Sequence, residues 1–491
     1  MTDKDYELVI GLEVHVQLAT ATKLFCRCNT KFGQPPNTQT CPVCTGMPGA
    51  LPVMNERAFE LALRTAVALN CEIPRFTKWD RKQYYYPDLP KGYQISQFDL
   101  PMSQNGWLEI SDPEDRFAPK RVGITRAHLE EDAGKSMHDE VAGRADSRID
   151  LNRTGTPLLE IVSEPDMRSA LEAKAYLTEL KLLLSYLDVS DCNMQEGSLR
   201  VDANVNLWIH DGDEVIATPI VEVKNMNSFR AVERALTYEA ERQQQVWKET
   251  KQRLGDVPKQ TRGWDDQLQV TKGQRSKEES SDYRYFPDPD LVPVTVSEEQ
   301  ITAAKTSQGE LPALLRQRLQ DDFEISAYDA DVLVNQGRDL VDYFLAAVKV
   351  SKDAKKTSNW IQRDVLRTLH EQEATIADFR VTADQLGTFV KSINDGELQS
   401  SRATEVFAHM YEHGKSATEA MSDLGIESVD ESDVVQLCQT LLNGNPKVVA
   451  DVQSGKQQAV GALIGQAKKQ NPNVDPGRVR EICLELISKM S

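Results

Sequence analysis

The segment Leu199-Arg-Val-Asp-Ala-Asn-Val-Asn-Leu207 alternates apolar and polar side chains without interruption. Successive side chains of a β-strand point to opposite faces, so this period predicts a half-buried strand with one polar face. A second, shorter segment repeats the pattern, because Val221 and Val223 alternate with Glu222 and Lys224. The region around residues 199–224 is therefore expected to contribute neighbouring strands to a sheet.

A helical pattern follows these strands. Ser228 is a suitable N-cap for a helix whose apolar residues recur at helical spacing, namely Phe229, Val232, Leu236 and Ala240. Strands and helix together predict an α+β fold for the first part of the chain.

Further along, the composition changes. After the strand-like Tyr283, Tyr285 and Phe286 comes a cluster of prolines at positions 287, 289 and 293, and beyond it the chain is rich in Ala, Leu, Lys, Glu and Gln. Helices are expected from near residue 295, with breaks near Gly414 and across Asn443–Pro446. With 491 residues the chain exceeds the roughly 250–300 at which single cores stop growing. We therefore expect three domains: residues 1–292 of the α+β class, an all-α domain over 293–414 and a small all-α tail over 415–491.

The charge distribution bears on possible partners. A formal net charge of −19 argues against a protein that coats nucleic acid nonspecifically, because that affinity comes largely from neutralising phosphates. Residues 441–491 are nevertheless basic, with seven Lys or Arg against four Asp or Glu. Either a terminal RNA-binding module or a solvated helix face explains this tail.

The hydropathy of the chain bears on its location. The N-terminus has neither the basic start nor the apolar length of a signal peptide, and no stretch approaches the roughly 18 apolar residues of a membrane span. We expect a cytoplasmic protein that binds neither membranes nor DNA.

Four of the eight cysteines form a compact pattern: Cys26, Cys28, Cys41 and Cys44. Two close thiolate pairs joined by a loop can supply four sulfurs to a tetrahedral zinc, and such a closed shell is structural rather than catalytic. A disulfide or free thiols would use the same residues, although disulfides are rare in a reducing cytosol. The pattern favours structural zinc.

Two polar motifs could carry chemistry. In Glu13-Val-His-Val-Gln17, strand alternation puts Glu13, His15 and Gln17 on one face, which suits a metal or proton-transfer site but equally a polar strand face. In His128-Leu-Glu-Glu-Asp132, clustered carboxylates repel one another unless a cation such as Mg²⁺ offsets the repulsion. A solvated acidic helix end is the alternative for this second motif.

Basic residues lie around these acids. Lys135 and Ser136 follow Gly134, but Leu129 stands where a P-loop requires glycine, so ATP would need another kind of cleft. Arg153 and Arg200 are candidates to bind phosphate or carboxylate oxygens through their forked guanidinium groups. Nearby acids in the sequence include Glu160, Asp202 and Glu222. Structural ion pairs would look the same.

An aromatic segment, Lys78-Trp-Asp-Arg-Lys-Gln-Tyr-Tyr-Tyr-Pro87, places Lys82 among rings. Such interleaving offers phosphate contacts and stacking faces for unpaired bases, as single-stranded RNA ends require. Aromatic strands in a sheet core would leave the same pattern.

Five strings taken together resemble the B subunits of tRNA-dependent amidotransferases, the GatB family. They are Gly11–His15, Tyr86–Gln97, His128–Lys135, Asp150–Asp166 and Asp282–Asp290, and the tail segment Gly455–Gly465 resembles the family's C-terminal module. The resemblance implies a cradle-like catalytic domain with an antiparallel sheet, followed by a helical domain and a tail that reaches tRNA.

The resemblance also implies an activity and partners. It implies a ligase in a heterotrimer with two other chains: an amidase that releases ammonia from glutamine, known as the A subunit, and a small C subunit. With ATP and Mg²⁺, the chain would phosphorylate the side-chain carboxylate of Glu-tRNA(Gln) or Asp-tRNA(Asn), and ammonia would displace phosphate.

Residues are assigned to these roles as expectations. The candidate catalytic groups are Glu13, His15, Lys82, Glu130, Glu131 and Arg153. The candidate nucleotide-binding groups are Lys135, Ser136, Arg200 and Lys224. The candidate magnesium ligands are Glu13, Glu130, Glu131 and Glu222. Competing hypotheses are a noncatalytic, zinc-dependent RNA-binding scaffold and a stand-alone ligase that needs no partner.

Overall fold

The computed structural model describes residues 6–138, 147–274, 283–426, 431–471 and 473–489. By contacts the chain divides into two compact units, Met1–Leu314 and Leu315–Ser491. The domain boundaries expected at residues 292 and 414 stay predictions. Within the described residues, no helix is both long enough and apolar enough to cross a membrane.

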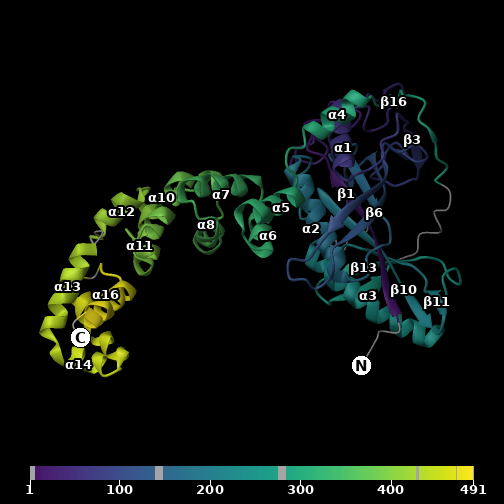
Figure 1. The fold of residues 1–491 in the computed structure, drawn as a ribbon. Coiled ribbons are helices and arrows are strands. Elements are labelled where there is room, and N and C mark those ends of the chain that lie inside the picture. The colour runs from purple at the N-terminus through teal and green to yellow at the C-terminus, as the bar shows by residue number, and fades with distance from the viewer. Residues whose placement is uncertain (1–5, 139–146, 275–282, 427–430, 472, 490–491) are drawn as a thin grey trace. The chain divides into compact units, whose positions relative to one another are not determined.

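The first unit is built on a large twisted sheet (Figure 1). Among the described residues nine strands belong to it, and eight of them follow the order β14-β13-β12-β10-β1-β9-β6-β5, with β11 paired to β10. The strands are β1 (Tyr6–Gln17), β5 (Gln104–Ile110), β6 (Lys120–Glu131), β9 (Pro157–Ser163), β10 (Leu199–Asp211), β11 (Glu214–Ala217), β12 (Val221–Lys224), β13 (Gln260–Asp265) and β14 (Val270–Gly273).

The strand predictions for β10 and β12 are confirmed. Their neighbours pair antiparallel, as the expected sheet requires, except that β12 and β13 run parallel. The sheet is therefore mixed rather than purely antiparallel.

Smaller two- and three-stranded sheets surround the large one. They are β15 (Phe286–Pro287) with β3 (Asp80–Gln83) and β4 (Tyr93–Ser96), β16 (Val294–Thr295) with β2 (Phe76–Thr77), and β7 (Lys135–His138) with β8 (Ser147–Asp150). The strand-like pattern at Tyr283–Phe286 is thus strand only at its end. Arg284 adopts φ +44°, in the left-handed region, and this interrupts the extended backbone before Phe286.

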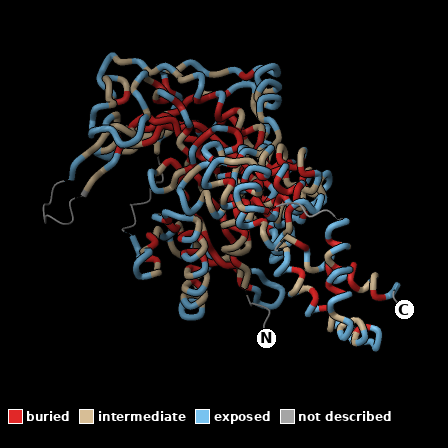
Figure 2. Tube along the Cα trace, turned by 90° about the vertical axis from the view of Figure 1, so that its left-hand side faces the viewer, coloured by how far each residue is buried: buried red, intermediate tan, exposed pale blue. Residues whose placement is uncertain are grey.

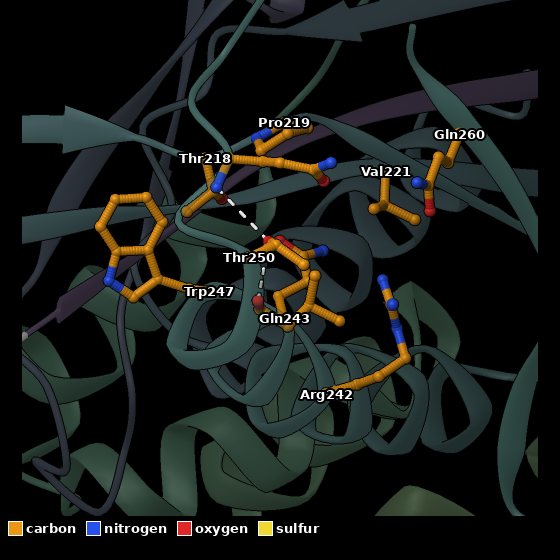
Figure 3. Close-up of a pocket in the computed structure, with 10 residues that line it drawn as sticks. Thr218, Pro219, Val221, Arg242, Gln243, Trp247, Thr250 and Gln260 are labelled. Carbon is orange, nitrogen blue, oxygen red and sulfur yellow. Dashed lines mark hydrogen bonds between the residues drawn. The ribbon is translucent and has the colours of Figure 1, made fainter. Parts of the chain in front are cut away.

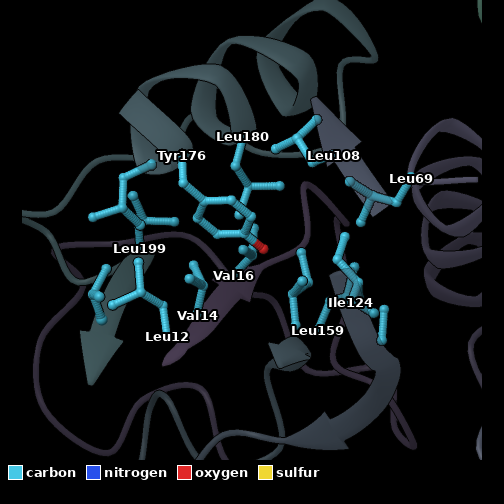
Figure 4. Packing of buried hydrophobic residues seen from close by; sticks show 14 of the residues in the cluster. Leu12, Val14, Val16, Leu69, Leu108, Ile124, Leu159, Tyr176, Leu180 and Leu199 are labelled. Atoms are coloured by element: carbon cyan, nitrogen blue, oxygen red, sulfur yellow. The ribbon is translucent and has the colours of Figure 1, made fainter. Parts of the chain in front are cut away.

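Helices cover the apolar side of the sheet. Leu12, Val14 and Val16 of β1 point toward Tyr176 and Leu180 of α2 (Ala170–Tyr186), as Figure 4 shows. All five are at most 1% exposed. Burying each such side chain stabilises the fold by about 1.5–3 kcal/mol. The alternation in β1 leaves Glu13, His15 and Gln17 on the opposite face, as predicted.

The other helices of this unit are α1 (Glu56–Ala68), α3 (Phe229–Thr250) and α4 (Glu298–Thr306). The prediction that Ser228 caps α3 is confirmed, because its side chain accepts a hydrogen bond from the Ala231 amide. Ile301 and Ala304 of α4 pack against the same core, so the first unit continues beyond the proline cluster.

The second unit is helical in its described residues, as the composition predicts. Its elements are α5 (Pro312–Phe323), α6 (Ala327–Asn335), α7 (Arg338–Ser351), α8 (Ala354–Trp360), a π-helical turn (Ile361–Val365), α9 (Leu366–Glu371), a 3₁₀ turn (Ile376–Asp378), α10 (Ala383–Asn394), α11 (Ser400–His413), α12 (Ala417–Asp423), α13 (Glu431–Gly444), α14 (Pro446–Gln453), a 3₁₀ turn (Gln457–Val460), α15 (Gly461–Gln470) and α16 (Pro476–Lys489).

The two predicted helix breaks are confirmed. Gly414 ends α11 in the left-handed conformation that glycine adopts without strain, and α13 stops before the proline that begins α14. Beyond the second break lies a separate core that joins α13 to α16 and includes Cys438, Leu463 and Cys483. Along these tail helices buried and exposed residues alternate (Figure 2).

Candidate active site

The polar face of the large sheet gathers side chains from four strands. His15 of β1 lies opposite Glu160 of β9, and Glu160 in turn lies opposite His128 of β6. On the other side of β1, Glu13 pairs with Asp202 of β10. Directly opposed residues in antiparallel strands have neighbouring side chains, so this register collects imidazoles and carboxylates in one place.

His15 is at the centre of this cluster. Its Nε2 atom lies 3.3 Å from Glu13 Oε1, 3.4 Å from Glu160 Oε2 and 3.9 Å from Glu130 Oε1. The possible ligand atoms form two sets, and within each set all atoms lie within 4.8 Å of one another. The sets are His15–Glu130–Glu160 and Glu13–His15–Asp202. Each set could hold a metal ion, and both share the same imidazole. We refer to these five residues as the acidic cluster.

Burial gives these groups unusual proton affinities. Burial, reinforced by the charge of Glu160, raises the pKa of Glu130 to about 7. Burial alone would lower the pKa of His15, but its hydrogen bond to Glu160 and the surrounding carboxylates raise it to about 9. Without a metal, the cluster thus holds protons at neutral pH that a bound cation would displace.

The motif His128–Asp132 forms a strand end rather than a solvated helix end. His128, Glu130, Glu131 and Asp132 are all at most 3% exposed. Burial lowers the pKa of His128 to about 4, and the imidazole Nδ1 has no hydrogen-bond partner among the described residues. The alternative interpretation of this motif as ordinary surface charge is wrong.

A cation from a neighbouring small sheet faces the cluster. Burial disfavours the charge on Lys82 of β3, yet Glu130 and other nearby groups outweigh burial and hold its pKa above the usual value. The ammonium lies 4.9 Å from the centre of the Tyr283 ring. Lys82 therefore stays charged beside the carboxylates, as its predicted catalytic role requires.

Asp132 brings two predicted arginines together. Arg200 Nη2 lies 2.9 Å from Asp132 Oδ1, and Arg153 Nε lies 3.5 Å from Asp132 Oδ2. Gln17 donates a 2.7 Å hydrogen bond to the same carboxylate. Burial would raise the pKa of Asp132, but Arg200 and Arg153 hold it below its ordinary range. Both guanidinium groups are thus held by a buried anion.

Glu131 lies apart from the acidic cluster. Neighbouring residues of a strand project to opposite faces, so Glu131 points away from Glu130. Its carboxylate pairs with Lys91 and accepts a 3.1 Å hydrogen bond from the Ile95 amide.

The remaining predicted groups also lie outside the cluster. Glu222 lies 3.4 Å from both Lys224 and Lys259, and Lys224 also pairs with Asp202. Lys135 is exposed and Ser136 half-buried on β7. The structure therefore brings Lys224 near the cluster through Asp202, and it shows no contact of Lys135 or Ser136 with the cluster among the described residues.

The four clustered cysteines converge. The Sγ atoms of Cys26, Cys28, Cys41 and Cys44 lie within 4.8 Å of one another. All eight cysteines, which lie in the described part of the chain, are free thiols. Four soft sulfur donors at this spacing suit zinc and leave no position for water.

Several aromatic rings near Lys82 are exposed rather than buried in a core. Tyr85 is 80% exposed and Phe98 47%. Phe98 and Tyr285 stack with ring centres 4.0 Å apart. Exposed rings beside a polar cluster can receive an unpaired base, which a buried aromatic strand could not.

A small cavity elsewhere is unrelated to these groups. It lies between α3 and the β12–β13 edge and is lined by residues such as Thr218, Gln243 and Trp247 (Figure 3). Its volume of about 30 Å³ suits a water molecule rather than a nucleotide. None of the predicted site residues lines it.

Comparison with known proteins shows the family to which this chain belongs. Residues 8–302 match the family described as the GatB/GatE catalytic domain, and residues 342–487 match the GatB domain. The chain belongs to the GatB family. A protein of Rhodopirellula baltica, named as the B subunit of aspartyl/glutamyl-tRNA(Asn/Gln) amidotransferase, is 61% identical over 98% of this chain and 97% of its own length. The proteins of the same name from Brevibacillus brevis and Moorella thermoacetica are each 46% identical over at least 98% of both chains.

In this GatB chain two members of the acidic cluster had no assigned role from sequence. Glu160 and Asp202 lie in polar surroundings in the sequence, but no local pattern connects them to His15. The missing signal is strand register, which decides which residues of distant segments face each other. The alternation in Leu199–Leu207 predicts which residues of β10 lie on the polar face. It does not show that Asp202, rather than another residue of that face, lies beside His15.

Proposed function

We propose that this GatB chain uses ATP to activate the side-chain carboxylate of Glu-tRNA(Gln), Asp-tRNA(Asn) or both, so that ammonia converts it to the amide. The carboxylate attacks the γ-phosphorus of ATP, and ADP leaves. Ammonia then adds to the acyl phosphate, and inorganic phosphate leaves with formation of Gln-tRNA(Gln) or Asn-tRNA(Asn). Phosphorylation is needed because a carboxylate is inert to ammonia at neutral pH.

The observation that carries this proposal is the acidic cluster with Lys82 at its edge. Phosphoryl transfer depends on positioning and charge stabilisation more than on a nucleophilic side chain. A Mg²⁺ ion, when bound, would offset the charge of the transferring phosphoryl group. We place Mg²⁺ in the two ligand sets that share His15, one with Glu130 and Glu160 and the other with Glu13 and Asp202, and we place Glu131 and Glu222 outside both sets.

The basic side chains support the same chemistry. Lys82 provides a fixed positive charge beside Glu130 and Glu160, where the substrate carboxylate and phosphate would meet. Asp132 holds Arg153 and Arg200, and the Nε of Arg200 has no partner among the described residues. We propose that Arg200 and Lys224 orient phosphate oxygens, with Lys135 and Ser136 as further candidates, and that exposed Tyr85 belongs to the surface that receives the tRNA end.

The proposal includes zinc and partner chains. The four cysteines fit a structural zinc because their sulfurs converge without forming disulfides. We propose a heterotrimer in which an amidase, the A subunit, supplies ammonia and a small C subunit joins the other two chains. In this assembly the basic tail contacts tRNA. We propose a cytoplasmic location, because aminoacyl-tRNA is made and used there.

The test is amidation of end-labelled Glu-tRNA(Gln) and Asp-tRNA(Asn) by the reconstituted heterotrimer with ATP and free ammonia. Free ammonia bypasses the amidase, so a loss of product reports on this chain. We expect Glu130→Gln to abolish most product formation while tRNA binding and assembly persist. Glu109→Gln, at an exposed position of β5, is the matched control.

A competing function, a noncatalytic zinc-dependent scaffold for RNA, predicts a different result. If Glu130→Gln amidates as fast as Glu109→Gln, the acidic cluster is structural and activation belongs to another chain of the heterotrimer. Amide synthesis by this chain without partners, from ATP and glutamine, would instead indicate a stand-alone ligase.

A further inference from the structure

Lys23 is a fully buried lysine that lies against the four-cysteine cluster. Its side chain is 0% exposed. The ammonium donates to the Gln39 carbonyl at 2.7 Å and to the Leu151 carbonyl at 3.3 Å, and it lies 3.7 Å from Cys44 Sγ. Among the described residues, no carboxylate lies within ion-pair distance of this ammonium. Within the described part of the chain, the group near the Lys23 ammonium that can carry a negative charge is therefore the Cys44 thiolate.

A buried charge without a counter-ion is strongly unfavourable, so buried lysines are normally paired or lose their proton. A zinc ion bound by four thiolates carries a net double negative charge. Placed beside Cys44, the ammonium of Lys23 offsets part of that charge, and the charge of the metal centre in turn stabilises the ammonium. The ammonium and the metal centre thus each offset the uncompensated charge of the other.

The same lysine contacts a turn that leads to the active site. Its bond to Leu151 reaches the segment 151–156, which contains Arg153. The Leu24 amide donates to the Gly155 carbonyl at 2.8 Å, and the Gly155 amide donates to the Asp132 carbonyl at 2.8 Å. The metal-binding segment and the residue that holds both arginines are therefore two hydrogen bonds apart.

Gly155 suits this turn through its backbone conformation rather than through a lack of space for a side chain. It adopts φ +83°, and a Cβ built on it would lie 3.5 Å from Glu131 Oε1, 3.6 Å from Cys44 Cβ and 3.6 Å from Lys23 Cδ. The turn is thus packed directly between the cysteine cluster and the end of β6. A shift of Lys23 would reach the turn through its hydrogen bond to the Leu151 carbonyl.

We propose that Lys23 is the counter-ion of the zinc–tetrathiolate centre and a positioning residue that couples occupancy of this centre to the 151–156 turn beside Asp132. The proposal depends on the zinc assignment made above, but not on which residues activate the substrate. Zinc binding would neutralise Lys23 electrostatically, keep its ammonium on the Leu151 carbonyl and so hold the turn that carries Arg153.

The first experiment compares zinc affinity in Lys23→Met and in Lys31→Met, made in the full-length chain. Met removes the charge while keeping a long side chain, and Lys31 is an exposed lysine near the same cysteines. Transfer of zinc to a chromophoric chelator gives the dissociation constant. We expect Lys23→Met to weaken zinc binding by roughly 10–100-fold, the usual cost of losing an outer-sphere partner of a metal site. Lys31→Met should match wild type, and so should Lys23→Met if the proposal is wrong.

The second experiment uses the wild-type chain, so it does not depend on a variant that folds poorly. Hydrogen–deuterium exchange is measured over residues 151–156 with zinc bound and after chelation, with residues 199–207 of β10 as the reference. After chelation we expect exchange in the turn to accelerate more than exchange in β10, which reports only the loss of global stability. Equal acceleration in the two segments would overturn the coupling.

A cobalt titration distinguishes failure of this proposal from failure of the zinc assignment. Tetrahedral Co²⁺ bound by four thiolates gives intense visible bands, and Lys23→Met should form them at higher cobalt concentration than wild type. If wild type forms no such bands and carries no zinc, the metal assignment and this proposal both fail. The amidation assay with Glu130→Gln would still decide the activation chemistry separately.

Discussion

The four-cysteine site and the acidic cluster differ in how their residues come together. Cys26, Cys28, Cys41 and Cys44 lie within one short stretch of chain, so a loop of ordinary length can collect them. The acidic cluster combines residues from β1, β6, β9 and β10, which the sheet register alone places side by side. The difference teaches that the spacing of residues in the sequence is enough to predict a local site, whereas a nonlocal site depends on pairing between distant segments.

The largest expected effect tests the nonlocal site through a residue that only the register identified. Glu160→Gln should lower the rate of amidation with ATP and free ammonia by about 10²–10³-fold, as loss of one charge-stabilising group does in other active sites. The physical reason is that Glu160 contacts His15 and belongs to a possible metal set. Single-turnover amidation by the reconstituted heterotrimer measures this.

Glu109→Gln is again the control, since Glu109 is exposed and pairs only with Arg121 among the described residues. If Glu160→Gln and Glu109→Gln amidate at the same rate, the residues that the register brings together form structural ion pairs rather than an active site.

The next effect tests the local site. Removing zinc should destabilise the first unit by about 2–3 kcal/mol, the linkage expected when free metal is near a hundred times its dissociation constant. Thermal unfolding with and without chelator measures the shift. The double variant Cys26→Ser/Cys28→Ser should unfold at the lower midpoint temperature even without chelator, and chelator should not change that temperature further. A chelator effect that survives in this variant would mean that the metal is bound elsewhere.

A third effect concerns protons at the acidic cluster. The pKa of Glu130 is raised to about 7, so below pH 7 a proton competes with a metal for this carboxylate. Mn²⁺ affinity, measured by titration calorimetry, should rise at least about tenfold per pH unit up to pH 7, because Glu130 releases one proton per metal bound and His15, if it is a ligand, releases a second.

The upper end of this pH range tests the role of His15. Its pKa is raised to about 9, so affinity should continue to rise between pH 7 and 9 if His15 itself binds the metal. A plateau above pH 7 would mean that His15 instead keeps its proton and donates it to Glu160. Glu130→Gln should take the contribution of one proton out of the slope below pH 7, and an unchanged slope would exclude Glu130 as a ligand.

The smallest effect is expected at Glu222. This carboxylate lies outside both ligand sets and pairs with Lys224 and Lys259, and partly exposed ion pairs are worth about 0–1 kcal/mol. Glu222→Gln should therefore change amidation less than about fivefold. A loss as large as that of Glu160→Gln would return Glu222 to the metal site, as the sequence had suggested.

Much of the fold could be predicted because its signals are local. The alternation in Leu199–Leu207, the cap at Ser228 and the break at Gly414 all depend on residues a few positions apart, and the structure confirms each of them. The site was predicted less completely. Adjacent acids were grouped because they are adjacent, although a strand sends Glu130 and Glu131 to opposite faces.

By itself, the sequence of this GatB chain determined which residue types are available, where strands and helices form, and that four thiols can meet. Tertiary structure alone decided that Glu160 and Asp202 join His15, that Asp132 holds Arg153 and Arg200, and that Lys23 is buried beside Cys44. The physical reason is the range of the interactions. Backbone geometry and periodic burial act over a few residues, whereas register and packing join segments more than a hundred residues apart, as the bond from Lys23 to Leu151 does.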